Sequence, residues 1–388
     1  MPVVGACQGL WLRKNLMAAF KYPFKYSAVL ALLLTIILMP LRLQAQNASG
    51  VPDVLDMPAM ETRHAQQSLQ LGISRAGKRL VSVGMRGIVL LSDDEGRNWR
   101  QARHVPVSTT LTDVEFVSAE QGWAVGHSGV LLFSGDGGEN WELRLDGNQA
   151  AQIILEGARE YLASGAEGAE RAVRNAEFLV DDGPDKPFLS VSFIDQYRGY
   201  LVGAYGLALE TRDGGKSWQS LVERIPNSRG NHLYQTLISG EQMLIVGEQG
   251  AVFRSEDSGE NFEKLSVPYP GTFFGALGID DDGLLVFGLQ GNVWRSMDGG
   301  VSWHQVDVGE PITVTAGLRL RDGSLLLADE SGRLLRSNNN GASFSELQMQ
   351  SGTGATALSE AGNSGLVVAS MRGVRRLENN MTEVGESQ

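Results

Sequence analysis

The sequence predicts an all-β fold, a seven-bladed β-propeller, from two observations. The first is a box of the form Ser/Thr-x-Asp-x-Gly-x-x-Trp, which occurs six times with small variations. The second is a glycine five residues before each box, at intervals of 42, 77, 44, 41 and 41 residues, with a seventh copy 41 residues further on. A period near 40 residues with a turn signal in every unit is typical of propeller blades. These glycines are Gly87, Gly129, Gly206, Gly250, Gly291, Gly332 and Gly373.

Each unit contains the signals of one small antiparallel sheet. In the fourth unit, residues 244–247 are a β-prone run, and the turn that follows contains Gly250, where glycine adopts a positive φ without strain. Residues 251–255 are a second run, and 257–261 are a second turn. Phe262 then opens a third strand with a ring large enough to be buried between neighbouring sheets.

The boxes are interpreted as hairpin staples and not as catalytic or metal sites. A short acid in a turn accepts hydrogen bonds from nearby backbone N–H groups, and the aromatic residue fills the space between blades. The residues given this structural role are Asp94, Asp136, Asp213, Asp257, Asp298 and Asn339, with Trp99, Trp141, Trp218, Phe262, Trp303 and Phe344.

Residues 1–45 have the layout of a secretory signal. Basic residues precede an apolar run at 28–39, and small residues favour cleavage near Ala45. The run is short for a spanning helix of about 20 residues, so cleavage is expected, with retention as an anchor the alternative. Met17 is an alternative start. Because the only cysteine, Cys7, lies in this segment, we expect no disulfide framework and a periplasmic or secreted protein.

The rest of the chain divides into an extended lead at 46–66 and the propeller at 67–385. Seven blades are expected, with six as the alternative count. The last unit has no box after it, and an open sheet edge is a liability. We therefore expect either residues 381–384 or the segment before Ser68 to supply the missing outer strand of the last blade.

The 77-residue interval marks an insertion at 148–182, between blades two and three. Its composition and apolar spacing predict a short helical hairpin that turns at Ser164 and Gly165. The hairpin is expected on the same face as the Val-Gly-x-x-Gly turns. Contact with a partner and simple packing against the ring are both open as its role.

Net charge excludes one class of partner. Formal net charge is -12 overall, and the chain after residue 45 carries 28 basic and 45 acidic residues. A phosphate backbone requires a positive footprint, so nucleic acid is not an expected partner.

Five arginines stand out as candidate partner-binding residues. Arg254, Arg295 and Arg336 each directly precede a box serine, so they are expected to form a row across three blades. This row is either a docking strip for carboxylates of a partner or a set of arginines that pair with acidic neighbours on adjacent blades. Arg86 and Arg372 belong to blades that become neighbours when the ring closes. They form either one cationic spot for an anion or two solvated arginines.

Catalysis has little support in the sequence. The five histidines have no metal-ligand spacing, and there is neither a G-x-S-x-G elbow nor a phosphate loop. The boxes resemble those of sialidases, and residues 224–226 resemble an arginine-containing motif of that family, although in a different place along the chain. We therefore expect no catalytic residues, cofactor or metal. A glycan-binding or glycan-hydrolysing propeller is the alternative function.

Two units, 116–141 and 193–206, resemble the photosystem II stability/assembly factor-like propellers, and the resemblance extends over about 68–377. It implies a seven-bladed, non-enzymatic lumenal or periplasmic scaffold that binds membrane-protein partners during assembly. A basic patch is implicated in partner binding in that family, and the Arg254, Arg295 and Arg336 row is its nearest counterpart here. The helical insertion departs from the family pattern.

The expected function is therefore a periplasmic scaffold that docks on a membrane protein or complex and aids its assembly or operation. Similar exported propellers of heterotrophic bacteria resemble accessory proteins of membrane transporters, so a transporter is one candidate partner. Docking is expected through a propeller face or through the helical insert.

Overall fold

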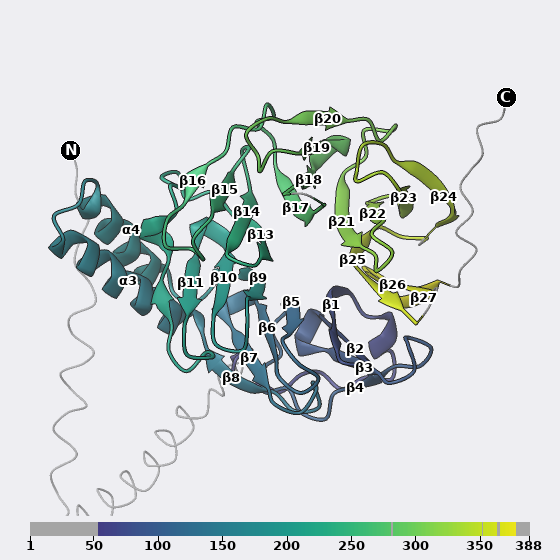
Figure 1. Ribbon diagram of the computed structural model, residues 1–388. Coiled ribbons are helices and arrows are strands. Elements are labelled where there is room, and N and C mark those ends of the chain that lie inside the picture. The colour runs from purple at the N-terminus through teal and green to yellow at the C-terminus, as the bar shows by residue number, and fades with distance from the viewer. Residues whose placement is uncertain (1–52, 281, 351, 363–364, 378–388) are drawn as a thin grey trace, which may run out of the picture. The chain divides into compact units, whose positions relative to one another are not determined.

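The computed structural model describes residues 53–280, 282–350, 352–362 and 365–377, which form seven antiparallel sheets arranged in a ring (Figure 1). The innermost strands of successive sheets contact one another around the ring, and the first and last sheets also contact each other. The predicted seven-bladed β-propeller is confirmed. The predicted signal segment, 1–45, lies outside the described residues.

The first three blades are four-stranded meanders. Blade one contains β1 (Gln70–Ala76), β2 (Arg79–Gly84), β3 (Val89–Ser92) and β4 (Arg100–Gln101). Blade two contains β5 (Leu111–Phe116), β6 (Gly122–Gly126), β7 (Leu131–Ser134) and β8 (Glu142–Leu145). Blade three contains β9 (Phe188–Phe193), β10 (Gly199–Gly203), β11 (Ala208–Thr211) and β12 (Gln219–Ser220).

Blades four to six repeat the same order. Blade four contains β13 (Leu233–Ser239), β14 (Gln242–Gly247), β15 (Val252–Ser255) and β16 (Glu263–Lys264). Blade five contains β17 (Phe273–Gly278), β18 (Leu284–Gly288), β19 (Val293–Ser296) and β20 (His304–Val306). Blade six contains β21 (Val314–Arg319), β22 (Leu325–Asp329), β23 (Arg333–Ser337) and β24 (Ser345–Gln350).

Blade seven has three strands in the described part of the chain: β25 (Ala355–Ala361), β26 (Gly365–Ser370) and β27 (Gly373–Leu377). One predicted source of its outer strand, 381–384, lies outside the described residues. The other, the segment before Ser68, forms no strand over residues 53–67. That segment contains instead the 3₁₀ turn η1 (Ala65–Gln67), which packs against β27.

Threonine hydroxyls join the inner strands of neighbouring blades. The second residue of β5, Thr112, donates from Oγ1 to the carbonyl oxygen of Phe188 in blade three, at 2.7 Å. Thr356 donates in the same way to Gln70, at 2.7 Å, and so joins blade seven to blade one. Because the inner strands of neighbouring blades share no ladder, these hydroxyl groups supply hydrogen bonds between them.

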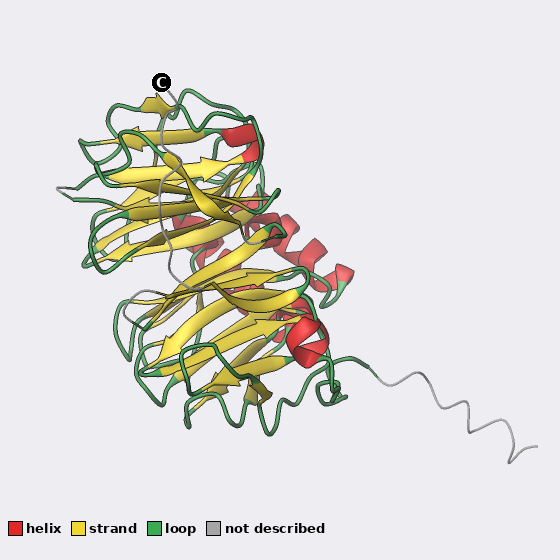
Figure 2. Cartoon of the chain, turned by 90° about the vertical axis from the view of Figure 1, so that its right-hand side faces the viewer, coloured by secondary structure: helices red, strands yellow, loops and turns green. Residues whose placement is uncertain are grey.

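The insertion forms two antiparallel helices, α3 (Gly147–Ala163) and α4 (Ala169–Asp182), which pack on the outside of the ring (Figures 1 and 2). Asp146 caps α3 in a capping box with Gln149, which defines where the helix begins. Its small and aliphatic face, including Ile154 and Ala158, is buried with residues of blades two and three. The predicted helical hairpin between these blades is confirmed.

The hairpin lies on the side of the ring that was expected. Helix α3 contacts both the outer strand β12 and the 3₁₀ turn η3 (His127–Gly129), which joins β6 to β7. The approach to this turn is close: a Cβ atom on Gly129 would lie 2.4 Å from the Cα atom of Gly147. The start of α3 therefore rests directly on a turn between the second and third strands of a blade.

Candidate functional site

The turns between the second and third strands define one rim of the propeller. Four of them are 3₁₀ turns: η2 (Met85–Gly87), η3, η4 (Ala204–Gly206) and η6 (Leu289–Gly291). The middle residue of η4, Tyr205, has a φ of 57°, which is rare for a bulky aromatic residue, and its side chain is 62% exposed. The fold therefore holds a large ring outward on this rim, beside the helical hairpin.

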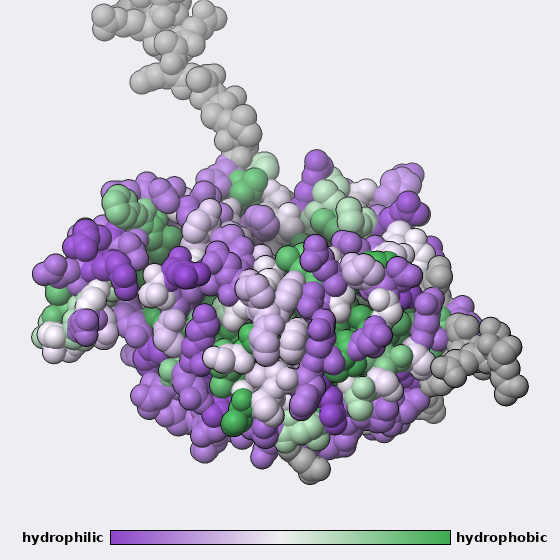
Figure 3. All heavy atoms as spheres, turned by 90° about the horizontal axis from the view of Figure 1, so that it is seen from above, coloured by the Kyte–Doolittle hydropathy of each residue, from purple (hydrophilic) through white to green (hydrophobic). Residues whose placement is uncertain are grey.

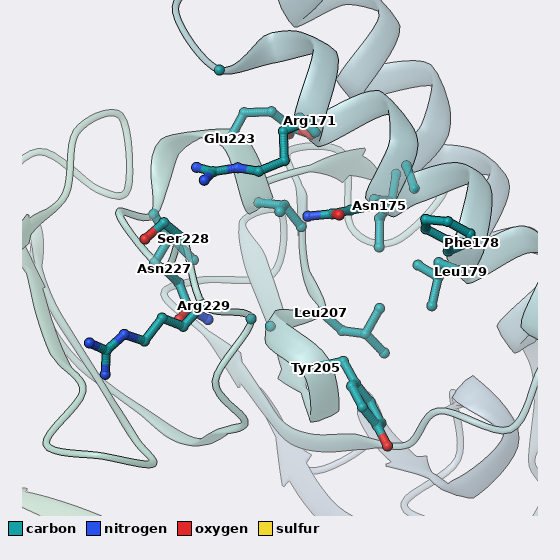
Figure 4. A pocket seen from close by; sticks show the side chains of 18 of the residues that line it. Arg171, Asn175, Phe178, Leu179, Tyr205, Leu207, Glu223, Asn227, Ser228 and Arg229 are labelled. Carbon is teal, nitrogen blue, oxygen red and sulfur yellow. The ribbon is translucent and has the colours of Figure 1, made fainter.

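A cavity of about 420 Å³ lies between helix α4 and this rim of blade three (Figure 4). We call it the hairpin cleft. Its walls include the buried apolar side chains of Ile154, Leu207 and Ile225, together with Val222. A volume of this size is in the range of ligand-binding pockets in proteins.

The wall opposite α4 is a loop held by its own side chains. Asn227 accepts a hydrogen bond from the backbone N–H of Asn231 at 3.1 Å and donates to the carbonyl oxygen of the same residue at 2.9 Å. The side chain of Asn231 donates in turn to the carbonyl oxygen of Glu248, at 3.1 Å. These bonds hold the loop in one conformation, which lowers the entropy lost when a ligand binds.

Charged side chains surround the mouth of the hairpin cleft. Lys186 forms ion pairs with Asp182, at 3.3 Å, and with Asp185, and its Nζ atom lies 5.3 Å from the ring centroid of Tyr205. The hydrogen bond that Lys186 donates to Asp185 is the main reason why the pKa of Lys186 is raised. Arg171 projects from α4 across the mouth (Figure 4). In the structure as described, no carboxylate lies within ion-pair distance of Arg171.

A row of aromatic rings continues from the cleft along the rim. The rings of Tyr205 and His232 lie 4.9 Å apart between centroids, those of His232 and Tyr234 lie 6.4 Å apart, and those of Tyr234 and Phe274 lie 5.1 Å apart. The row passes from blade three to the inner strands β13 and β17 of blades four and five. We refer to these four residues as the aromatic row.

The sequence reasoning missed a pair of carboxyl groups on the inner strand β5. Asp113 accepts a hydrogen bond from the backbone N–H of Val191 at 3.0 Å, and Glu115 accepts one from that of Phe193 at 2.8 Å. Burial raises the pKa of Asp113 to about 6. Burial, together with the neighbouring Asp113, raises the pKa of Glu115 to about 8. The signal in the sequence was two acids at alternate positions of a strand that also contains Leu111, Val114 and Phe116.

The box residues hold their own turns. In the fifth box, Ser296 donates to Asp298, at 2.7 Å, and accepts the backbone N–H of Gly300, at 2.8 Å. Asp298 accepts hydrogen bonds from the side chain and from the backbone N–H of Ser302. These bonds, of which the side-chain bond has the larger effect, lower the pKa of Asp298 to about 2. Trp303 donates from its indole nitrogen to the carbonyl oxygen of Gly300, at 3.0 Å. Each of these polar groups is thus engaged inside the turn.

The row of three arginines does not form a continuous set of free cations. Arg254 ion-pairs with Glu263 and Glu256, and it donates to the carbonyl oxygen of Gly299 in the next blade. Arg295 donates to the carbonyl oxygen of Asn340 in the next blade, at 2.7 Å. Arg336 pairs with Asp322 of its own blade, at 2.7 Å. A docking role for the row stays a prediction.

Arg86 and Arg372 lie in equivalent turns of neighbouring blades, and both are exposed. Arg86 contacts the Sδ atom of Met60 through its Nη1 atom, at 3.2 Å. Over the residues described, neither arginine forms an ion pair with a carboxylate. Both therefore present their charge at the same rim as the hairpin cleft, at the junction of blades one and seven.

Arg224, the arginine of residues 224–226, is engaged in contacts within the propeller. Arg224 ion-pairs with the buried Glu210 and donates to the carbonyl oxygen of Gly259, at 2.9 Å. Among the described residues there is no cluster of three or more potential metal ligands. In the same part of the chain, no helix has the length and apolar character needed to cross a membrane.

Comparison with known proteins places these features in context. The family model for photosynthesis system II assembly factor YCF48 matches residues 59–133, 94–158 and 178–363, which is more than half of the chain. The photosystem II assembly lipoprotein Ycf48 of Synechococcus sp. (strain CC9902) is 34% identical over 77 residues, or 20% of this chain. This match spans only 23% of that relative.

Solved structures share the fold at low sequence identity. A structure of YCF48 bound to D1 peptide has a TM-score of 0.59 and 16% identity, covering 83% of this chain and 99% of that one. YCF48 from Cyanidioschyzon merolae has a TM-score of 0.58 and 17% identity, with 80% and 95% covered. A GH74 xyloglucanase from Xanthomonas campestris has a TM-score of 0.56 and 11% identity, covering 81% of this chain and 52% of its own.

Proposed function

Since the chain belongs to the photosynthesis system II assembly factor YCF48 family, we propose that it is a non-enzymatic scaffold that docks on a membrane protein or complex and aids its assembly. The observation that carries the proposal is the hairpin cleft on the rim of blade three. A rigid loop, an apolar floor and an arginine without an ion pair in the described residues are the features of a recognition surface and not of a catalytic centre.

The rim supplies further groups for docking. Tyr205 and Phe178 are exposed by 62% and 66%, at opposite sides of the cleft. Arg86 and Arg372 extend the docking surface along the rim to blades one and seven. Figure 3 shows the edge of the ring from above the view of Figure 1, where apolar side chains lie in small patches among polar ones. Exposed aromatic and arginine side chains are the residue types enriched at protein interfaces.

We place the protein in the periplasm or an equivalent exported compartment. The basic residues followed by an apolar run before Ala45 support export, and a related protein is named a lipoprotein. A solved family member is described as bound to D1 peptide, which supports a peptide segment of a membrane protein as the kind of partner. A transporter is the candidate partner in a host without photosystems.

Affinity capture tests this function. The full chain with a C-terminal tag is expressed in its own host, cross-linked, and captured from detergent-solubilised membranes. We expect one integral membrane protein or complex to be enriched reproducibly over a tagged, unrelated exported propeller. Capture of no membrane protein in repeated experiments at several cross-linker lengths would overturn the scaffold proposal.

A further inference from the structure

We propose that the hairpin cleft and the aromatic row bind one extended peptide segment, in which a carboxylate side chain lies next to large apolar side chains. This inference rests on the proposed scaffold function and names the chemistry of the segment that docks. Its basis is the combination of an apolar floor, a cation at the mouth and a row of four adjacent rings.

The floor of the cleft is suited to an apolar side chain. Ile154 and Leu207 are each 4% exposed and Ile225 is 5% exposed, so the walls are part of the packed core and do not collapse into the cavity. Phe178 stands at the outer edge on α4. A leucine or phenylalanine side chain of a partner would exchange water for these surfaces, which is favourable by the hydrophobic effect.

The mouth of the cleft carries donors for a carboxylate. Arg171 and Asn175 lie one turn apart on α4, and both side chains point across the opening toward residues 226–230 (Figure 4). Of the other charged groups at the cleft, Asp182 and Asp185 pair with Lys186 and Arg229 donates to Gln249 at 3.2 Å, whereas Glu167 has no ion pair among the described residues. A guanidinium group with no ion pair in the described structure binds a carboxylate through two parallel hydrogen bonds, and an amide adds further donors.

Glu167 would oppose an anion there, and so would Glu223, which lines the cleft as well. The Oε2 atom of Glu223 accepts a hydrogen bond from the hydroxyl group of Ser220, at 2.6 Å, on the side of blade three. Glu223 is therefore oriented by its own blade. The carboxylate of Glu223 is thus held on the side of the ring, while Arg171 on α4 is the donor that would face a carboxylate of the ligand.

The aromatic row indicates an extended chain as the ligand. Its centroids are spaced by 4.9, 6.4 and 5.1 Å, from Tyr205 through His232 and Tyr234 to Phe274. In an extended strand, side chains on one face recur about every 6.6 Å. At 4.9 to 6.4 Å the rings are spaced more closely than this, so side chains on one face of a peptide leaving the cleft would stay against ring surface along the row. A compact small molecule would occupy the cleft and leave the row uncovered.

Two labelled decapeptides test the proposal with the full chain. One alternates Phe and Glu, and in the other Lys replaces Glu; binding is measured by fluorescence anisotropy at low salt. We expect the Glu peptide to bind at least about tenfold more tightly than the Lys peptide, as one charge-assisted bidentate contact predicts. Arg171→Glu should reverse this preference, and Asn175→Trp should weaken both peptides by filling the mouth.

Arg174→Glu is the matched control. Arg174 is exposed on the same helix and lies 3.9 Å from Glu170, but it does not line the cleft. The control should change affinity less than about twofold. Circular dichroism of each variant confirms that it is folded. Any of three outcomes would overturn the proposal. The wild-type protein could bind the two peptides equally, the two charge reversals could have equal effects, or Asn175→Trp could bind as tightly as the wild-type protein.

The capture experiment separates this inference from the function on which it rests. Arg171→Glu should recover less of the membrane partner than Arg174→Glu does. If both variants capture the partner as the wild-type protein does, the cleft is not the docking site and the scaffold function stands. If the wild-type protein captures nothing, the scaffold function itself fails.

Discussion

The Nη1 atom of Arg254 donates a hydrogen bond to the carbonyl oxygen of Gly299 in the next blade, at 2.6 Å. Gly299 occupies the position between the Asp and the Gly of its box, and the same carbonyl is used at four other interfaces between blades. These contacts are Arg79 to Gly137, Tyr200 to Ser258, Arg295 to Asn340 and Arg376 to Glu95. Five of the boxes therefore join their blade to a neighbour as well as closing a turn.

Replacing Arg254 should destabilise the ring. Arg254→Met removes the bond to Gly299 and leaves that carbonyl group with one partner fewer, which should lower the free energy of unfolding by about 1–2 kcal/mol. The exposed ion pair with Glu263 adds little to this value. Denaturant unfolding of both proteins measures the difference.

Arg144→Met is the comparison, since Arg144 ion-pairs with Glu142 at 2.9 Å and lies over the ring of Phe133, both in its own blade. It should cost less than Arg254→Met. An equal loss for the two variants would show that the contact between blades is not what stabilises the ring. Unchanged partner capture by a charge-reversed Arg254, Arg295 and Arg336 variant would assign the whole row to structure.

The repeat spacing was sufficient to predict the propeller, because the box and the glycine of each unit indicate local turns. Such turns can be recognised without knowing how the rest of the chain folds. The helical hairpin was predictable for the same reason, from its length and composition. The role of Arg254 was not, because its acceptor, Gly299, lies 45 residues away in a different blade. The position of a residue within its repeat does not indicate which carbonyl group of another blade its side chain will face.

The hairpin cleft was also outside the reach of the sequence. Its lining comes from α3, α4, η4 and the loop at 226–230, which become neighbours only when the hairpin docks on blade three. The expectation that the segment before Ser68 completes blade seven failed over residues 53–67 for a related reason. That segment bonds instead to the rim of blade one, where the backbone N–H of Met60 donates to the carbonyl oxygen of Arg86, at 3.2 Å.

The carboxyl pair on β5 should make stability depend on pH. The pKa of Glu115 is raised to about 8 in the folded protein, so the unfolded chain releases its proton first as pH rises. Stability is then greatest below the unfolded pKa of about 4.3 and falls as pH rises toward 8, by at most about 1.4 kcal/mol per pH unit for one proton. Melting temperatures measured between pH 4 and 9 follow this change.

Glu115→Gln is the variant that isolates the effect. It keeps an oxygen to accept the N–H of Phe193 and removes the titrating proton, so its melting temperature should fall less steeply between pH 5 and 8. Asp113→Asn should act at lower pH, because the pKa of Asp113 is raised only to about 6. A wild-type profile that is flat or rises over this range would contradict the raised pKa values.

Docking of the hairpin depends on the small residue Gly157. A Cβ atom at this position would lie 2.5 Å from the Cβ atom of Ser220 in blade three. Gly157→Leu should therefore separate α3 from the ring and speed hydrogen exchange in residues 147–182 by an order of magnitude or more. Glu156→Leu, on the exposed side of the same helix, should leave exchange unchanged, and equal exchange in the two variants would refute the close contact.

Two box tryptophans should respond differently to the same substitution. The indole N–H of Trp141 donates to the carbonyl oxygen of Gly138, at 2.9 Å, whereas that of Trp218 is buried with no acceptor among the described residues. Trp141→Phe should lower the free energy of unfolding by about 1–2 kcal/mol, from a lost hydrogen bond and a small void.

Trp218→Phe removes a buried N–H donor that has no described partner. The loss of this unsatisfied donor should offset the cost of the void that the smaller ring leaves, so the free energy of unfolding should change by close to zero. Both residues pack edge-on against a phenylalanine, Phe116 for Trp141 and Phe193 for Trp218, which makes the pair a fair comparison. Denaturant unfolding of the two variants gives the difference directly. A Trp218→Phe loss as large as that of Trp141→Phe would mean that ring packing, and not the bond to the turn, is the main contribution of these residues.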